Sequence, residues 1–254
     1  MTQEERIHEI RQLLNQKHHL VTRDLANYFN VSFDTARRDV LRLTSTGQAI
    51  RVHGGLLANN QENVPNFLTR NQIDSPIKTK MAQMAQRFVH PNQCDFIGPS
   101  TTLKKLCELI NGIDIQIVTN SIDNSLELMQ SRMPAVRLLG GKIDKEHRFS
   151  YSVTSLKTLE RMSFNTAFIG TSNVKKDGIY SNRMSDSELT RLAASRAKQV
   201  VVVAEQYKFN SQNTSPFMSI PLEQIDVLIT DTPLSQEMQS CFSPSTQIIP
   251  VLRK

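Results

Sequence analysis

Cysteine is scarce in this sequence, and long apolar runs are absent from it. The three cysteines, Cys94, Cys107 and Cys241, form no C-x-x-C pair. We therefore predict reduced thiols in a cytoplasmic protein, with no metal site. No stretch of about 18 apolar residues occurs, so we expect no membrane-spanning segment. Residues 1–6 carry acidic side chains and begin no apolar segment, which argues against a signal peptide.

The length and the charge of the chain set further bounds. A chain of 254 residues is long enough for one large or two modest domains, each with its own core. Its net charge of +6 suits an anionic partner such as nucleic acid or a phosphate group. Residues 1–57 contain eight Lys and Arg against six Asp and Glu. Binding of DNA by this segment would therefore depend on where the arginines lie rather than on bulk charge.

Residues 1–57 begin with the pattern of two short helices. A helix is predicted over residues 2–17, because apolar residues recur there at helical spacing and Thr2 with Glu5 matches a capping box. A second helix is predicted to start with Thr22 as its N-cap. Asn30 suits the turn that follows, since asparagine tolerates left-handed backbone.

A third helix, over residues 33–43, carries the arginines. Its apolar side is formed by Ala36, Val40 and Leu43. The side chains that we expect to contact DNA are Ser32, which caps the helix, Thr35, Arg37, Arg38 and Arg42. Two short helices joined by a tight turn, the second capped by serine and rich in arginine, are typical of a helix-turn-helix DNA reader.

A short basic strand follows this helix. Gly47 is predicted to end the helix, and apolar residues then alternate with Arg51 and His53 up to a turn at Gly54-Gly55. The pattern predicts a β-wing that places Arg51 and His53 near phosphates or the minor groove. The alternative is a three-helix docking module with solvated arginines, since arginines on a helix face are usually only solvated.

The order of these features resembles a known signature. Residues 31–55 are similar to the DeoR family of bacterial transcriptional regulators, with S-x-x-T-x-R-R-D-L-x-x-L followed by G-x-x-x-R-x-H-G-G. Ala36 replaces the larger aliphatic residue that is usual in the family. The resemblance implies a winged helix-turn-helix that binds operator DNA.

The composition changes after this segment. Residues 58–75 are polar and without periodicity, which predicts a linker. The linker would join a DNA-binding domain at residues 1–57 to a second domain at residues 76–254. A helix is expected near the start of the second domain, over residues 77–89.

Short apolar runs alternate with helical patterns in the second domain. Strands are predicted at 94–98, 115–119, 135–139, 166–170, 200–204, 227–230 and 247–251, and further helices at 103–110, 121–130, 154–161 and 186–197. This alternation implies an α/β domain with a mostly parallel sheet covered on both faces. Ligands of such sheets bind at the carboxyl ends of the strands.

Small and hydroxyl-bearing residues follow four of the strands. A loop of this kind at a helix N-terminus binds phosphate well, although each loop alone could serve only as a cap or a turn. Because all four lie at one edge, we predict a polar cleft for a phosphorylated polyol. We assign to it Gly98, Ser100, Thr101, Thr102, Asn120, Ser121, Gly140, Gly141, Gly170, Thr171 and Lys208. G-x-G-x-x-G is absent, which disfavours NAD.

These loops also resemble the sensor domain of the DeoR family. That domain is itself similar to ribose-5-phosphate isomerase and glucosamine-6-phosphate deaminase. Its D-x-G-T-T loop matches residues 98–102, its T-N matches 119–120 and its G-G matches 140–141. Its lysine matches Lys208, and a glutamate common in the domain matches Glu188, which we add to the effector site. The two resemblances cover nearly the whole chain.

The sequence also departs from the family pattern. Gly98 stands where many members carry Asp, Ser100 where they carry Gly, and Glu205 where Asp is more usual. The variant G-P-x-T-T resembles the lactose phosphotransferase system repressor subgroup of Gram-positive bacteria, whose effector is tagatose 6-phosphate. Tagatose 6-phosphate or a related sugar phosphate is therefore the first expectation for the effector.

Three functions are compatible with these features. The chain is a repressor controlled by a sugar phosphate, a sugar-phosphate isomerase or deaminase, or a scaffold with a vestigial pocket. An enzyme needs a general base and a partner acid near the substrate. The candidates Asp95, His147, Glu188 and Glu205 form no paired or His-assisted arrangement in the sequence. We therefore expect a non-enzymatic repressor of a sugar-utilisation operon, with no cofactor.

The expected partners follow from this function. They are a double-stranded DNA operator, a phosphorylated sugar and further copies of the chain, with no membrane. A two-fold dimer would bind half-sites about 10 bp apart. The sequence leaves open the operator sequence, dimer against tetramer, and an inducing against a co-repressing effector.

Overall fold

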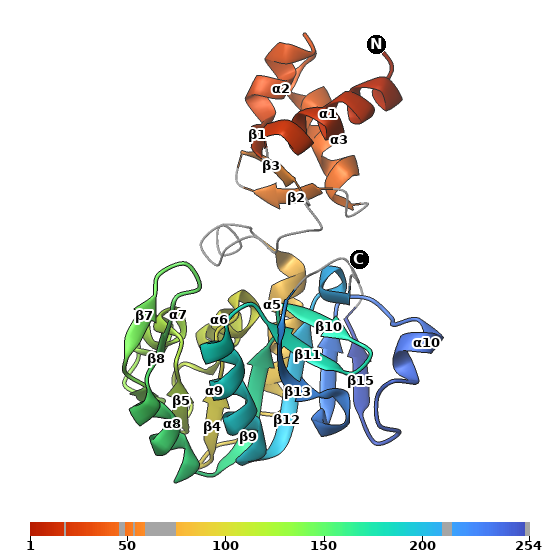
Figure 1. Cartoon of the computed structure of the whole chain (residues 1–254). Coiled ribbons are helices and arrows are strands. Elements are labelled where there is room, and N and C mark those ends of the chain that lie inside the picture. Colours follow the sequence, from red (N-terminus) through yellow and green to blue (C-terminus); the bar gives the residue numbers. More distant parts are fainter. Residues whose placement is uncertain (18, 46–48, 53, 59–74, 210–214, 252–254) are drawn as a thin grey trace. The chain divides into compact units, whose positions relative to one another are not determined.

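The computed structural model describes residues 1–17, 19–45, 49–52, 54–58, 75–209 and 215–251. The chain divides into two compact units, Met1–Asp74 and Ser75–Lys254, which are described separately (Figure 1). Residues 59–74, most of the expected linker, lie outside the described residues, as do Gly47 and His53.

The first unit combines three helices with a small antiparallel sheet. Its elements are α1 (Gln3–Lys17), β1 (His19–Val21), α2 (Thr22–Tyr28), α3 (Phe33–Ser45), β2 (Ala49–Val52) and β3 (Gly55–Ala58), with strand order β1-β3-β2. The capping box of α1 is confirmed, since Thr2 N donates to Glu5 Oε2 at 2.7 Å and Glu5 N to Thr2 Oγ1 at 3.3 Å. A core that includes Ile10, Leu25 and Leu56 joins the helices to the sheet.

Two details at the start of α2 differ from the prediction. Val21, not Thr22, is the N-cap residue of α2, and Thr22 is buried in the first turn. The cause is β1, a strand of three residues that pairs with β3 and that periodicity did not reveal. Asn30 has a φ of 50° between α2 and α3, which confirms the expected left-handed turn.

The two adjacent glycines of the wing serve different purposes. Gly54 has a φ of +80°, a conformation that favours glycine in the turn between β2 and β3. At Gly55, a Cβ would lie 2.1 Å from Leu20 O of β1, so only glycine allows that strand to approach. The G-G pair therefore holds the wing against the helical part of the unit.

The second unit is an α/β domain built on one parallel sheet, as predicted. The sheet has the order β15-β14-β12-β9-β4-β5-β6. Its strands are β4 (Cys94–Ile97), β5 (Gln116–Thr119), β6 (Ala135–Leu138), β9 (Phe164–Gly170), β12 (Ala197–Ala204), β14 (Val227–Thr230) and β15 (Gln247–Pro250). The helices are α5 (Pro76–Gln86), α6 (Thr101–Ile110), α7 (Ile122–Leu128), α8 (Val153–Glu160), α9 (Met184–Ser195) and α10 (Gln236–Gln239), with the short helices η1 (Gln206–Phe209) and η2 (Leu222–Gln224).

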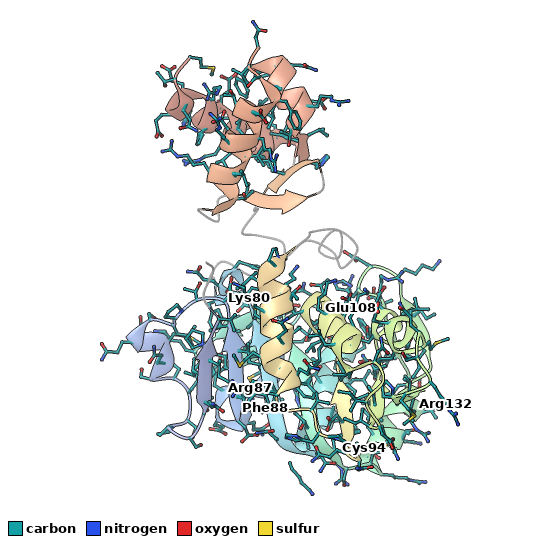
Figure 2. All side chains as sticks on the ribbon, turned by 180° about the vertical axis from the view of Figure 1, so that it is seen from behind. Lys80, Arg87, Phe88, Cys94, Glu108 and Arg132 are labelled. Atoms are coloured by element: carbon teal, nitrogen blue, oxygen red, sulfur yellow. The ribbon has the colours of Figure 1, made fainter. Side chains whose placement is uncertain are left out.

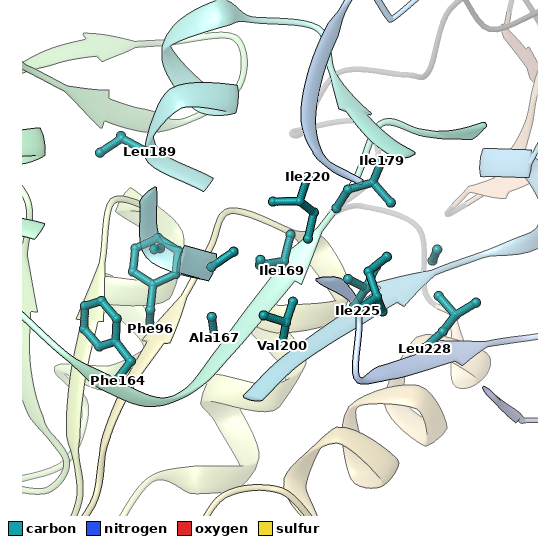
Figure 3. Packing of buried hydrophobic residues seen from close by; sticks show 14 of the residues in the cluster. Phe96, Phe164, Ala167, Ile169, Ile179, Leu189, Val200, Ile220, Ile225 and Leu228 are labelled. Atoms are coloured by element: carbon teal, nitrogen blue, oxygen red, sulfur yellow. The ribbon is translucent and has the colours of Figure 1, made fainter. Parts of the chain in front are cut away.

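Helices cover both faces of this sheet. α5, α6 and α7 pack on one face, where Lys80 lies on α5 and Glu108 on the neighbouring α6 (Figure 2). α8 and α9 pack on the other face. The residues of β12 alternate between these layers: Val200 and Val202 belong to the core on the side of α9, and Val201 and Val203 to the core on the side of α5 and α6. Figure 3 shows Val200 and Leu189 of α9 among the residues of the first of these cores. The apolar run at residues 200–204 of β12 is thus explained by burial on both sides.

Two small antiparallel sheets complete the unit, and neither was predicted. One pairs β7 (Lys142–Asp144) with β8 (Phe149–Tyr151), and the other has the order β10 (Asn173–Lys175), β11 (Gly178–Ser181), β13 (Phe217–Pro221). Strands of three to five residues with mixed exposure carry too few alternations for a sequence pattern. No helix in the described part of the chain is long and apolar enough to cross a membrane.

Candidate DNA interface and candidate effector site

The start of α3 is fixed by its own side chains. Thr35 N donates to Ser32 Oγ at 3.2 Å, and the hydroxyls of Ser32 and Thr35 lie 2.8 Å apart. Ser32 is therefore the N-cap residue that the sequence predicted. Both residues lie at the first turn, where a helix N-terminus favours a phosphate.

Two of the predicted arginines project from α3 into solvent. Arg37 and Arg38 are exposed, and neither makes a hydrogen bond or an ion pair with another described residue. Phe33, which begins the same helix, is 51% exposed. Because neither arginine is held by a described residue, both are able to bind phosphates or guanine edges without loss of such a contact.

Arg42 is placed differently from Arg37 and Arg38. Its guanidinium donates to Gln3 Oε1 at 3.0 Å and pairs with Glu4, both on α1. All three side chains are exposed, and such surface pairs contribute only about 0–1 kcal/mol. A phosphate could therefore still compete for Arg42, but the residue also ties α3 to α1.

A buried ion pair that sequence reasoning missed joins the same two helices. Asp39 is 1% exposed and accepts from Arg6 Nε at 2.7 Å and from Arg6 Nη2 at 3.2 Å. The hydrogen bond with Asp39 raises the pKa of the Arg6 guanidinium. Asp39 also accepts from Gln3 Nε2 at 2.9 Å. The aspartate in the R-R-D motif thus positions the helix, whereas the arginines beside it face outward.

The structure describes the backbone of the wing at residues 49–52 and 54–58. Arg51 lies in β2 opposite Leu56 of β3, and its side chain is outside the described atoms. His53 lies outside the described residues. The predicted DNA contacts of both residues remain predictions.

The four predicted effector loops meet at one edge of the sheet. Their strands are neighbours in the order β9-β4-β5-β6, and all run parallel. Asn124 Nδ2 donates to Gly98 O at 2.9 Å, which ties the loop after β4 to the helix after β5. A Cβ at Gly170 would lie 2.6 Å from Ser100 Cβ, so the loops after β9 and β4 are in close contact.

Several of the predicted ligand hydroxyls are already used by the fold. Ser100 Oγ accepts from Thr102 N at 3.2 Å and Leu103 N at 3.4 Å, and Ser121 Oγ accepts from Asn124 N at 3.2 Å. Thr171 Oγ1 donates to Asn173 O at 2.7 Å. These hydroxyls cap or turn the chain, which is the alternative function that we considered for such loops.

Two other hydroxyls in the loop after β4 have no such role. Thr101 and Thr102 are 5% and 4% exposed at the first turn of α6, and their hydroxyls bond to no other described residue. They lie where the amino end of a ten-residue helix favours an anion.

The Gly140-Gly141 pair shapes the entry to the β7–β8 hairpin. Gly140 O accepts from Ser152 Oγ at 3.0 Å and from Ser155 Oγ at 2.5 Å. Gly141 has a φ of 142°, and a Cβ there would lie 2.1 Å from Tyr151 O. Glycine at 141 is therefore required by the turn itself.

Two lysines lie near the carboxyl end of β12. Lys208 in η1 is 5% exposed, with Nζ 4.7 Å from the centre of the Tyr207 ring. Lys78, in the first turn of α5, is also 5% exposed, and its Nζ lies 3.9 Å from Glu205 Oε1. Lys78 was missed because α5 directly follows the expected linker. Nothing in the sequence of α5 indicates that its first turn lies near the carboxyl end of β12.

The acidic side of this edge is formed by α9 and the β7–β8 hairpin. Glu188, predicted as an effector ligand, accepts from Tyr151 OH at 2.6 Å. Asp186, two residues closer to the start of α9, was not predicted. Burial raises its pKa to about 6, and the nearby Ser181, His147 and Asn120 act in the opposite direction. An S-D-S-E sequence at a helix start is the only signal that could have indicated it.

The groups considered for an enzyme do not assemble into an acid–base pair. Asp95 lies in the amino half of β4, away from the loops, and its Oδ1 accepts from Thr166 N at 2.9 Å. Burial raises its pKa to about 7. His147 Nδ1 lies 3.2 Å from Asp144 Oδ1 within one hairpin. Among the described residues, no His, Cys, Asp and Glu cluster is suited to a metal ion.

Comparison with known proteins identifies both units. Residues 6–62 match the model of the DeoR-like helix-turn-helix domain, and residues 73–232 match that of the DeoR C terminal sensor domain. The HTH-type transcriptional repressor GlcR of Bacillus subtilis is 32% identical over 91% of this chain and 89% of that protein. The lactose phosphotransferase system repressor of Streptococcus mutans is 29% identical over 98% of this chain and 100% of its own.

Solved structures give a more distant match. Ribose 5-phosphate isomerase A from Neisseria gonorrhoeae aligns with 53% of this chain and 53% of its own, with 19% sequence identity and a TM-score of 0.39.

Proposed function

The chain belongs to the DeoR family of transcription regulators, and we propose that it is a repressor of a sugar-utilisation operon whose operator affinity is controlled by a phosphorylated sugar. The observation that carries the proposal is the outward placement of Arg37 and Arg38 on a serine-capped helix, in a chain whose second unit collects polar groups at one sheet edge. The domain limits proposed are 1–57, 58–75 and 76–254.

The DNA contacts proposed are those of α3 and the wing. Arg37 and Arg38 would bind phosphates or guanine edges, with Ser32 and Thr35 near the helix start and Arg42, Arg51 and His53 at the margins. A homo-oligomer would present two such helices to half-sites about 10 bp apart. The protein would act in the cytoplasm, where both its operator and sugar phosphates are found.

The effector would occupy the edge formed by the ends of β4, β5, β6, β9 and β12. Its phosphate fits the first turn of α6, where Thr101 and Thr102 have hydroxyls available and the helix dipole favours an anion. Tagatose 6-phosphate is the first sugar to test, because a lactose phosphotransferase system repressor is similar along its whole length. An isomerase or deaminase is not favoured, since Asp95 accepts from Thr166 N in the amino half of β4 and His147 Nδ1 lies against Asp144 Oδ1 within one hairpin.

Arg38→Ala tests the DNA interface. We expect the affinity for operator DNA to fall by about 1–3 kcal/mol, which is roughly 5- to 150-fold, because one base or phosphate contact is removed. The operator would be recovered from a random duplex pool with the full chain, and binding measured by fluorescence anisotropy at several salt concentrations. A phosphate contact would flatten the dependence of log Kd on log salt, and a base contact would relax specificity at one position.

Arg132→Ala is the matched control for this test. Arg132 is exposed on the second unit (Figure 2), and its removal changes the net charge equally. If Arg38→Ala binds the operator as tightly as Arg132→Ala at every salt concentration, α3 is not the recognition helix.

A further inference from the structure

The carboxyl end of β5 carries a buried amide, the side chain of Asn120. Asn120 follows β5 directly and is 0% exposed. Among the described residues, neither its Oδ1 nor its Nδ2 makes a hydrogen bond of normal geometry. The backbone of the same residue is fixed, since Asn120 O accepts from Ser150 N at 2.9 Å. A buried amide held in this way and left unsatisfied is rare in native proteins and costs stability.

A second unsatisfied group lies beside this amide. Asp186 Oδ1 is fully buried and has no hydrogen-bond partner in the described part of the chain. The two side chains are neighbours, because Asn120 is among the nearby groups that lower the pKa of Asp186. One donor and two acceptors therefore remain available at the same point of the sheet edge.

We propose that Asn120 and Asp186 bind hydroxyl groups of the effector sugar, at the end of the ligand opposite its phosphate. The proposal rests on the proposed function. It adds which end of the site binds the sugar hydroxyls. A hydroxyl both donates and accepts, so it matches an amide that offers both roles and a carboxylate that only accepts.

The charges along the edge orient the ligand. Asp186 stands near Asp144 on the hairpin, and Glu188 follows on α9, so a phosphate at this end would meet several acids. The lysines Lys78 and Lys208 lie instead toward β12, on the other side of β4. The phosphate therefore belongs at the α6 terminus after β4, and the hydroxyls belong at β5.

The spacing of the strands allows one small molecule to reach both the first turn of α6 and Asn120. β4 and β5 are adjacent, and neighbouring strands lie about 4.8 Å apart. The loops after them are joined directly, since Asn124 Nδ2 donates to Gly98 O at 2.9 Å. A sugar phosphate bound at Thr101 and Thr102 extends over β5 with its hydroxyls near Asn120.

The test compares sugar phosphates with inorganic phosphate on the full chain. Affinities are measured from thermal shifts of the wild type, Asp186→Asn and Asn120→Ala, with tagatose 6-phosphate, fructose 6-phosphate and inorganic phosphate as probes. We expect both variants to bind the sugar phosphates at least tenfold more weakly and inorganic phosphate unchanged. Asp114→Asn is the control, since Asp114 is exposed and precedes the amino end of β5, the strand that Asn120 follows.

A second measurement changes the ligand and starts from the wild-type protein. The probes are deoxy sugar phosphates, each of which lacks one hydroxyl of the parent. The probe that lacks the hydroxyl in contact with Asn120 or Asp186 should bind the wild type at least tenfold more weakly than the parent does. Asp186→Asn should bind parent and deoxy probe alike. Equal binding of the parent by wild type and both variants, or loss of inorganic phosphate together with the sugar phosphates, overturns this inference alone. A wild type that binds no sugar phosphate overturns the proposed function with it.

Discussion

Asp39→Ala will unfold much of the DNA-binding unit while leaving the second unit intact. The substitution removes the carboxylate that accepts two hydrogen bonds from Arg6, a residue that is 8% exposed and whose charge would remain buried. Removing one partner of a buried ion pair costs about 3–5 kcal/mol, because the remaining charge is uncompensated. Small domains have total stabilities of a similar size.

Circular dichroism during heating separates the two units. We expect the transition of the first unit to move below physiological temperature in Asp39→Ala, the transition of the second to stay, and operator binding to be lost. Asp34→Ala is the matched control, since Asp34 is an exposed carboxylate in the first turn of the same helix. It should cost about 1 kcal/mol or less, through its contact with the helix dipole alone. If Asp39→Ala melts as the control does, the Arg6–Asp39 pair does not hold α3.

Lys208→Ala will abolish the response to sugar phosphates without weakening operator binding. Lys208 is 5% exposed, so a phosphate bound near its Nζ would be paired with a largely desolvated charge. Truncating one partner of a buried charge pair costs about 2–5 kcal/mol, or roughly 30- to 5,000-fold in affinity. The first unit is untouched, and repression should therefore persist.

Two measurements check this result. The first is isothermal titration with the sugar phosphate that stabilises the wild type most, and the second is operator binding without effector. Lys198→Ala is the control, because Lys198 is exposed near the amino end of β12, the strand that leads to Lys208. Thr101→Ala should show the same pattern as Lys208→Ala. Loss of operator binding in either variant contradicts the separation of a DNA reader from a sensor.

The sequence predicted the elements whose pattern repeats. The Arg-bearing helix was expected over residues 33–43 and is observed as Phe33–Ser45, and the buried strands of the parallel sheet were found within a few residues. These predictions succeeded because both periodicities depend on burial within one element. β1 was missed because its partner β3 is distant in the sequence, and β7 and β8 were missed because strands of three residues show no alternation.

Side chains that act through a distant partner were the least predictable. Asp39 sits between core and surface in the helical pattern, and only the fold places Arg6 beside it. Asp186 and Lys78 reach the sheet edge from helices whose sequences give no sign of it. Ser100 and Ser121 were predicted as ligands from their position after strands; their hydroxyls cap helices, and their effector contacts stay predictions. The structure thus narrows the proposed ligand contacts to fewer residues than the sequence indicated, among them Thr101, Thr102 and Asn120.

The central claim is that one ligand, bound at the sheet edge, changes the affinity of α3 for DNA. A ligand shifts this equilibrium only if it binds the weak-binding conformation better than the tight-binding one. The direct measurement is fluorescence anisotropy of the selected operator with the full chain at fixed salt, with and without the sugar phosphate that thermal shift identifies. We predict an operator affinity roughly 5- to 150-fold lower with the sugar phosphate. An unchanged affinity at a concentration that saturates the sensor would contradict the account.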